Sequence, residues 1–263
     1  MDPIQAIILG FIQGLTEWLP ISSTGHLRIA EHFFGLSVPV LFDVILHFGT
    51  LTVILLFFRK DVKNIVEALV KGDFKSENGK LIPIIIVGTV PTLLIGFFLG
   101  NTLDTYFSSL PALGGGFIVC AGALYVSKFG AERKENITYI EALLIGTAQG
   151  IAIIPSISRS GITIVAALLL GIRREKAFKF SFLLSVPSII GALGLTLYEQ
   201  HQLLTLAGIG LTEIIVGVAA SIIVSFFALK LLWRTLASKK FHFFAIYCVA
   251  IGVLLIGLSL SGF

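Results

Sequence analysis

The sequence predicts an all-α polytopic membrane protein with six transmembrane helices and two re-entrant helix–loop–helix pairs. Hydrophobic residues make up 56% of the 263 positions and charged residues 13%, about half of the roughly 25% that is usual in soluble domains. Several apolar stretches approach the roughly 20 residues that a helix needs to cross a bilayer. Two further apolar regions carry Pro, Gly and Ser in their middle. This composition excludes a disordered chain, a nucleic-acid-binding arm and an ordinary soluble enzyme.

The expected elements follow in order along the chain. The six crossings cover about 40–58, 81–100, 111–128, 177–197, 209–232 and 242–261. The two interrupted regions cover about 4–36 and 139–172. Each half is too short to cross, because a helix of about 12 residues rises only about 18 Å. Interrupted helices persist at membrane depth only where they are buried in protein or face a wet cavity. Each region is therefore predicted to enter and leave the membrane on one side.

The two interrupted regions are copies of each other. Shifting the chain by 136 residues aligns ten identities in 37 positions without a gap, including two Gln-Gly pairs and two Ser-x-x-Gly turns. Each copy holds one interrupted pair followed by three crossings, and an odd number of crossings inverts the second copy. We therefore expect a single integral membrane domain over 1–263, built from inverted repeats at about 1–128 and 137–263. Membrane transporters built this way bind near the midplane, where broken helices meet.

The basic residues predict which face is cytoplasmic. Of the 19 Lys and Arg residues, 17 fall in four stretches on one face of the six-span arrangement: 59–80, 128–138, 173–179 and 230–240. By the positive-inside rule this face is cytoplasmic. The sequence therefore predicts a multi-pass plasma-membrane protein. Its first interrupted pair and termini lie on the outer side, its site opens to the extracytoplasmic side, and it has no nucleic-acid partner.

The first interrupted region carries ionisable residues at membrane depth. Gln13 and Glu17 are four residues apart and share a helix face. An intramembrane carboxylate is costly, so Glu17 is a functional candidate by default; the alternative is an interfacial carboxylate near a helix end. Three hydroxyl residues follow at the start of a new helix, Ser22, Ser23 and Thr24. Backbone N–H groups at a helix start favour anions, and His26 can move a proton near neutral pH. The alternative is a capping turn with a buried His.

The second interrupted region carries Arg159 between Ser158 and Ser160, far from the other basic residues. The planar guanidinium fits phosphate oxygens; the alternative is an Arg that extends to the cytoplasmic interface. Under the shift of 136 residues, Glu17 and His26 align with isoleucines and Arg159 aligns with a serine. The copies thus agree at packing positions and differ at ionisable ones. This pattern predicts one asymmetric site made from both copies near the midplane.

At these residues the chain resembles the integral-membrane undecaprenyl-diphosphate phosphatases, also called bacitracin-resistance proteins. Their two signatures correspond here to Gln13–His26 and Pro155–Gly161. The resemblance implies a hydrolase that releases phosphate from polyprenyl (undecaprenyl) diphosphate and regenerates the monophosphate lipid carrier for peptidoglycan synthesis and cell-wall biogenesis. Two positions depart from the family pattern, because Gln13 and Ser156 stand where family members usually have Glu and Gly.

The resemblance also suggests roles for the candidate residues. Ser23 would be the nucleophile or a phosphate ligand, and His26 would move a proton. Arg159 would hold the terminal phosphate. Glu17, helped by Gln13, would orient His26 or bind a divalent cation, Mg²⁺ or Ca²⁺, which prefer hard oxygen ligands. The catalytic set is therefore Glu17, Ser23, His26 and Arg159, and the substrate-binding set is Gln13, Ser22, Thr24, Ser158 and Ser160.

Three further points stay open at this stage. The expected partners are a polyprenyl diphosphate and membrane lipid, and a homodimer is one open arrangement. The main alternative function is an inverted-repeat translocase that moves a lipid phosphate without hydrolysing it. Such a carrier needs a charged ligand such as Arg159 but has less use for a clustered Ser, His and Glu set. A structural membrane scaffold would leave Glu17 and Arg159 unexplained.

Overall fold

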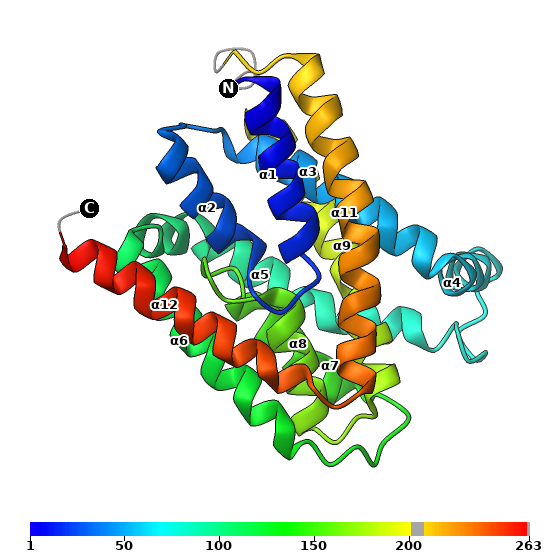
Figure 1. Cartoon of the computed structure of the whole chain (residues 1–263). Helices are drawn as coiled ribbons and strands as arrows, with labels where there is room; N and C mark the ends of the chain where they lie inside the picture. The colour runs from blue at the N-terminus through cyan, green and yellow to red at the C-terminus, as the bar shows by residue number, and fades with distance from the viewer. Residues whose placement is uncertain (201–207, 262–263) are drawn as a thin grey trace.

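The computed structural model of the chain describes residues 1–200 and 208–261, and it is helical throughout, with no β-strand in these ranges (Figure 1). Six helices within them are long and apolar enough to cross a membrane. They are α3 (Val40–Phe57), α5 (Leu81–Phe107), α6 (Leu110–Val126), α9 (Arg174–Gln200), α11 (Leu211–Ala237) and α12 (Phe244–Leu260). The all-α fold and the six crossings expected from the sequence are confirmed.

Five helices in the same described ranges are too short to cross. They are α1 (Pro3–Thr16), α2 (Ser23–Phe34), α4 (Arg59–Lys71), α7 (Tyr139–Ile151) and α8 (Arg159–Leu169). Two single 3₁₀ turns, Ser127–Phe129 and Phe241–Phe243, flank the basic end of the bundle. Each interrupted region of the sequence therefore forms two short helices. Residues 17–22 separate α1 from α2, and residues 152–158 separate α7 from α8; we call them the first and the second turn.

The two interrupted regions begin and restart with matching caps. Asp2 caps α1 and Thr138 caps α7, each through a capping box. Ser22 caps α2 and Ser158 caps α8, each accepting a hydrogen bond from a glycine N–H three residues later. Both pairs of caps are 136 residues apart, the spacing of the sequence repeat. A side-chain cap satisfies N–H groups that would otherwise lack a partner at membrane depth.

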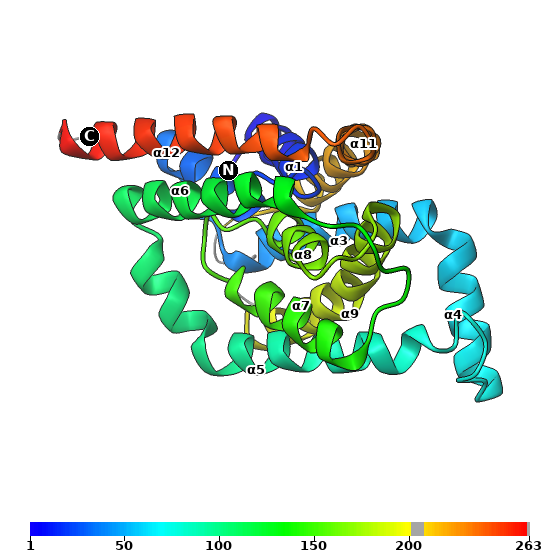
Figure 2. The same cartoon turned by 90° about the horizontal axis from the view of Figure 1, so that it is seen from below.

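The helices of one half pack on those of the other half in a reciprocal way. Helix α1 lies along α11, and α7 lies along α5, on opposite sides of the bundle (Figure 2). At the first crossing, a Cβ on Gly10 would collide with the carbonyl of Gly217, and at the second, a Cβ on Gly146 would collide with the carbonyl of Gly88. Small residues permit this close backbone approach, on which helix packing in lipid depends.

A buried aromatic cluster holds the first turn in place. Trp18 is fully buried and meets Phe182 of α9 edge-on, with ring centroids 5.2 Å apart. Phe182 in turn packs against Phe178 at 4.6 Å. The indole Nε1 of Trp18 donates a hydrogen bond to Ser225 of α11. Because its bulk and its one polar atom are both engaged, Trp18 anchors the turn between two membrane-crossing helices.

The basic stretches gather at one end of the bundle, which we call the basic end. Four ion pairs join them: Arg173–Glu135, Arg174–Glu132, Lys176–Glu77 and Lys179–Asp61. Both chain ends lie away from this end, while α4 projects from it (Figure 1). The shared face agrees with the sequence pattern. Its assignment to the cytoplasmic side stays a prediction.

Candidate active site

The carboxylate of Glu17 is the centre of a buried polar network. Glu17 is 6% exposed and follows the last residue of α1. Its Oε1 accepts a hydrogen bond from Arg159 at the start of α8. Its Oε2 accepts from Ser23 Oγ at 2.6 Å and from Gln13 Nε2 at 3.0 Å. The structure therefore brings together four residues that the sequence singled out, from both interrupted regions.

A fifth group, His47, joins this network. His47 lies in the middle of α3, and its Nε2 is 3.2 Å from Glu17 Oε2. Its Nδ1 is 2.7 Å from the main-chain oxygen of Asp43. A carbonyl oxygen can only accept, so Nδ1 carries a hydrogen. His47 Nε2 and Glu17 Oε2 are within ion-pair distance, and the pair is charged when the imidazole carries a second proton.

The guanidinium of Arg159 is only partly used by the protein. Nη2 donates to Glu17, and the group lies over the Trp18 ring at 5.4 Å from its centroid. Nη1 is buried and has no hydrogen-bond partner among the described residues. A buried charged donor without an acceptor is strongly unfavourable. Arg159 is therefore ready for an anionic ligand.

Ser158 and Ser160 bind the two turns together. Ser160 Oγ donates to the main-chain oxygen of Trp18 at 3.0 Å. Ser158 Oγ accepts from the N–H of Gly161 and lies 3.2 Å from Ser160 Oγ. Ser158 lines the polar cavity that is described in the next paragraph, whereas Ser160 does not. Ser160 therefore joins the two turns, and its part in substrate binding stays a prediction.

This network forms one end of a cavity of about 750 Å³, which we call the polar cavity. Its polar end includes Glu17, Ser22, Ser23, Thr24, His47 and Arg159. Its walls come from α5 and α9 and are mostly apolar, with Leu93, Leu94, Phe97, Phe98, Ile189 and Leu195 among them. Thr92, Ser188, Thr196 and Glu199 of the same helices also line it. Gln13 is fully buried and reaches the cavity only through Glu17. A charged end joined to apolar walls suits a lipid with an anionic head group.

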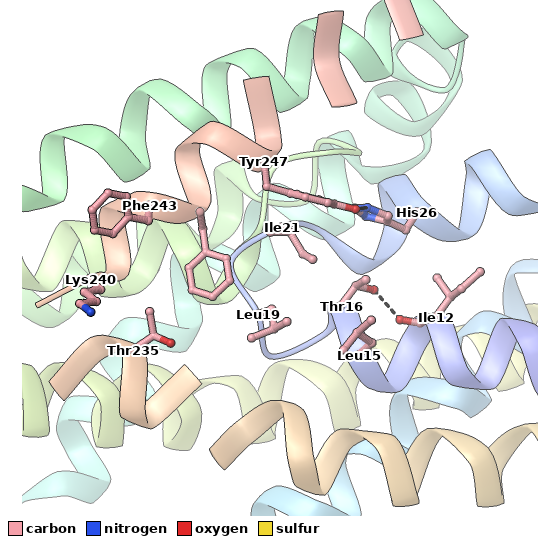
Figure 3. Close-up of a pocket in the computed structure, with 11 residues that line it drawn as sticks. Ile12, Leu15, Thr16, Leu19, Ile21, His26, Thr235, Lys240, Phe243 and Tyr247 are labelled. Atoms are coloured by element: carbon pink, nitrogen blue, oxygen red, sulfur yellow. Dashed lines mark hydrogen bonds between the residues drawn. The ribbon is translucent and has the colours of Figure 1, made fainter. Parts of the chain in front are cut away.

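His26 lies elsewhere, in a second cavity on the other side of the first turn (Figure 3). Its ring stacks on Tyr247 of α12, with Nε2 2.7 Å from Tyr247 Oη. Its Nδ1 is 2.7 Å from the main-chain oxygen of Ser22. The polar cavity takes Ser23, Thr24, Leu27 and Arg28 from α2. At about 100° per residue, these four residues cover an arc of about 140° around the axis of α2, and His26 lies about 60° outside this arc. The His26 side chain therefore leaves the helix on a different face.

The site does not offer Glu17 to a metal ion. Within residues 1–200 and 208–261 there is no group of three or more His, Cys, Asp or Glu side chains that could hold one. The carboxylate oxygens of Glu17 already receive hydrogen bonds or ion pairs from Gln13, Ser23, His47 and Arg159. One of these partners, Arg159, is a cation, and all four use the oxygen lone pairs that Mg²⁺ or Ca²⁺ would need. The residues in this arrangement do not fit a divalent cation on Glu17.

Ser156, the other departure from the family pattern, has a left-handed backbone with φ of 71°. Glycine adopts this conformation readily, whereas a residue with a Cβ is strained there. The side chain is fully buried, and its Oγ has no hydrogen-bond partner in the described part of the chain. A glycine at this position would avoid the strain that the positive φ imposes on Ser156.

The fold and site define a class, an integral-membrane protein with a buried Ser, Glu, His and Arg cluster at the end of an apolar cavity. The chain belongs to the family of the bacitracin resistance protein BacA, whose family model matches residues 6–254. It is 42% identical to the undecaprenyl-diphosphatase of Carboxydothermus hydrogenoformans, over 100% of this chain and 99% of that protein. The undecaprenyl-diphosphatase of Korarchaeum cryptofilum is 39% identical over 98% of this chain and 100% of its own length. These matches confirm the resemblance carried by the two motifs.

Proposed function

We propose that this protein hydrolyses the terminal phosphoanhydride bond of a polyprenyl diphosphate, releasing phosphate and the monophosphate lipid carrier. The relatives named undecaprenyl-diphosphatase support this activity. The observation that carries it is the contact of Ser23 and Arg159 with one buried carboxylate at the polar end of an apolar cavity. Carrier recycling fits a role in cell-wall synthesis and in bacitracin resistance, for which the family is named.

Ser23 and Glu17 are the proposed nucleophile and base. The hydroxyl hydrogen of Ser23 already points to Glu17 Oε2 across 2.6 Å, so Glu17 can take this proton as Ser23 Oγ attacks the terminal phosphorus. The bond from that phosphorus to the bridging oxygen breaks, and the polyprenyl monophosphate leaves with the bonding electrons. Water then hydrolyses the phosphoserine. This sequence releases one phosphate and restores Ser23.

Arg159 is the proposed phosphate-binding group. Its Nη1 can donate to the terminal phosphate while Nη2 stays on Glu17, which places the phosphorus beside the nucleophile. The first backbone N–H groups of α2, at Ser23 and Thr24, supply further donors for an anion at a helix start. Stabilisation of developing charge by such groups commonly contributes about 100- to 1000-fold in rate.

His47 is proposed to supply the proton for the leaving group, since it lines the polar cavity beside Glu17 and its imidazolium form can donate a proton from Nε2. His26, which the sequence suggested for proton transfer, is proposed instead to position the first turn. Its bond to the Ser22 main-chain oxygen supports the residue that precedes Ser23. Its ring lines the second cavity and so does not face the proposed substrate.

The alternative, a translocase that moves a lipid phosphate without hydrolysis, is less well supported. A carrier needs a cationic ligand such as Arg159 but gains nothing from a serine hydroxyl bonded to a carboxylate. Phosphate release from polyprenyl diphosphate by the purified protein in detergent separates the two functions. We expect release by the wild type and loss of release in Ser23→Ala. A wild type that binds substrate but releases no phosphate would favour the carrier.

The arrangement in the membrane is also a proposal. We propose one membrane domain over 1–263 made of inverted repeats, supported by the matching caps and the reciprocal packing of α1 on α11 and α7 on α5. The polar cavity takes residues from the ends of α5 and α9 farthest from the basic end, among them Gly100 and Thr196. With the basic end cytoplasmic, this cavity opens extracytoplasmically. Thr196→Cys should then react with a membrane-impermeant thiol reagent added outside cells. A homodimer stays a prediction that molar mass in detergent tests.

A further inference from the structure

A second cavity, of about 580 Å³, lies behind the first turn, and we call it the rear cavity. Within the described residues, no residue lines both this cavity and the polar cavity. The rear cavity is bounded by α1, α2, α12 and the last turn of α11 (Figure 3). Most of its lining is apolar: Ile12, Leu15, Leu19, Ile21, Phe243 and Phe244. Neither the proposed reaction nor its substrate accounts for this space.

The rear cavity has one charged group, at one end. Lys240 lies near Thr235, away from His26 and Tyr247 at the other end (Figure 3). The ammonium group of Lys240 has no ion-pair partner in the part of the chain that the structure describes. Among the described residues, the opposite end has no Lys, Arg, Asp or Glu side chain in its lining, and the ring nitrogens of His26 lie 2.7 Å from Tyr247 Oη and from the Ser22 main-chain oxygen. The cavity is therefore apolar along its length and cationic at one end.

Lys240 lies where the charged head group of a membrane lipid would lie if the acyl chain occupied the apolar part of the rear cavity. Lys240 belongs to the basic end of the bundle, where the protein meets the head-group layer. Tyr247 is seven residues further along, in the first turn of α12. The rear cavity thus continues from Lys240 past Phe243 to Tyr247 and His26 (Figure 3). A lipid with one negative charge can place that charge at Lys240 and its acyl chain along Phe243. It then occupies both the cationic end and the apolar length of the rear cavity.

We propose that the rear cavity binds an anionic glycerophospholipid of the bilayer, with its phosphate at Lys240 and an acyl chain behind the first turn. A polyprenyl diphosphate carries more negative charge and is better matched by Arg159 and His47 in the polar cavity. A basic residue near the surface strengthens binding of an anionic lipid by about fivefold. The bound chain would pack on Leu19 and Ile21, so the lipid would support the turn that carries Glu17 and precedes Ser23.

The test measures lipid retained by the purified full chain, without substrate, and so does not depend on the proposed hydrolysis. Delipidated protein in detergent is mixed with phosphatidylglycerol or with phosphatidylcholine of the same acyl chains, and native mass spectrometry counts bound lipid. The wild type should prefer phosphatidylglycerol by about fivefold. Lys240→Gln should lose this preference. Lys239→Gln is the matched control, because Lys239 is exposed like Lys240 but does not line the rear cavity, and it should keep the preference.

A second variant tests the position of the acyl chain. Thr235→Phe fills the rear cavity beside Lys240 without removing charge, so it should reduce retention of both lipids at least about threefold. Three results would overturn the proposal. These are equal loss of preference in Lys239→Gln and Lys240→Gln, unchanged retention in Thr235→Phe, or a wild type that retains polyprenyl monophosphate in preference to phosphatidylglycerol.

Discussion

Replacing Arg159 with lysine keeps the positive charge and removes the shape that the site uses. The guanidinium reaches Glu17 through Nη2 and leaves Nη1 for a ligand, with its plane held over Trp18. A lysine ammonium is a compact charge on a flexible stem and cannot hold two acceptors in this fixed geometry. Arg159→Lys should therefore lose either the contact to Glu17 or the contact to phosphate.

The size of the effect follows from the one contact that is lost. A hydrogen bond to a charged group contributes about 1.5–3 kcal/mol, and each 1.4 kcal/mol corresponds to about tenfold in rate. We expect phosphate release to fall by roughly 10- to 150-fold. Removing the charge altogether, as in Arg159→Ala, should reach or exceed the upper part of this range, because the carboxylate of Glu17 then also loses its guanidinium partner.

The assay is phosphate release from polyprenyl diphosphate in detergent at saturating and at limiting substrate. Arg173→Lys is the matched control, since Arg173 is half exposed at the basic end and pairs with Glu135; it should behave like the wild type. Elution profile and melting temperature show that Arg159→Lys is folded. Near-normal turnover in this variant would refute the reasoning, because Arg159 would then serve only topology or packing.

Three further substitutions test other parts of the site. His47→Asn should lower kcat about 100-fold, within the range for lost acid–base catalysis, and change the shape of the pH–rate profile. His32 is exposed, and His32→Asn should change neither quantity. An unchanged pH–rate profile in His47→Asn would show that His47 takes no part in the reaction. Gln13→Glu places a second carboxylate beside Glu17. Since adjacent carboxylates repel unless a cation lies between them, phosphate release should become more dependent on Mg²⁺ or Ca²⁺. If phosphate release against cation concentration is the same for the wild type and the variant, Gln13 is a packing residue. Ser156→Gly should relieve a positive φ and a buried unpaired hydroxyl, raising the melting temperature by about 2–4 °C for each kcal/mol gained; a lower melting temperature would contradict this account.

Most of the fold could be predicted because lipid imposes simple rules. Apolar length identifies crossings, and Pro, Gly and Ser in the middle of an apolar region identify the interruptions. Helix α4 (Arg59–Lys71) was not predicted, because its residues were counted only as a basic stretch. Its apolar residues recur at helical spacing, as in Val62, Val66 and Leu69, which favours an amphipathic helix at the membrane interface.

The candidate site was predicted in part, and the two histidines show why. Glu17 and Arg159 could be found because a charge at membrane depth needs a functional reason. The same rule applies to His47, in the middle of an apolar crossing, but no neighbouring motif marks it, and only the fold brings α3 beside Glu17. His26 lies within the motif, but the face of α2 on which its side chain lies depends on how that helix is rotated about its axis. Closeness to Ser23 in the sequence does not determine this rotation.

The two glutamines of the repeat show how one active site arises from two similar halves. Gln149 of α7 donates to Thr92 of α5 and to Ser188 of α9, so it joins three helices of the scaffold. Gln13 occupies the matching position in α1 and donates to Glu17 instead. The position that matches Glu17 in the second half is Ile153, so no second carboxylate is buried there. Burying a charge requires partners on every side, and one set suffices for one substrate. The caps and glycine contacts can therefore stay alike in both halves, while a few ionisable positions decide what each half contributes to the proposed site.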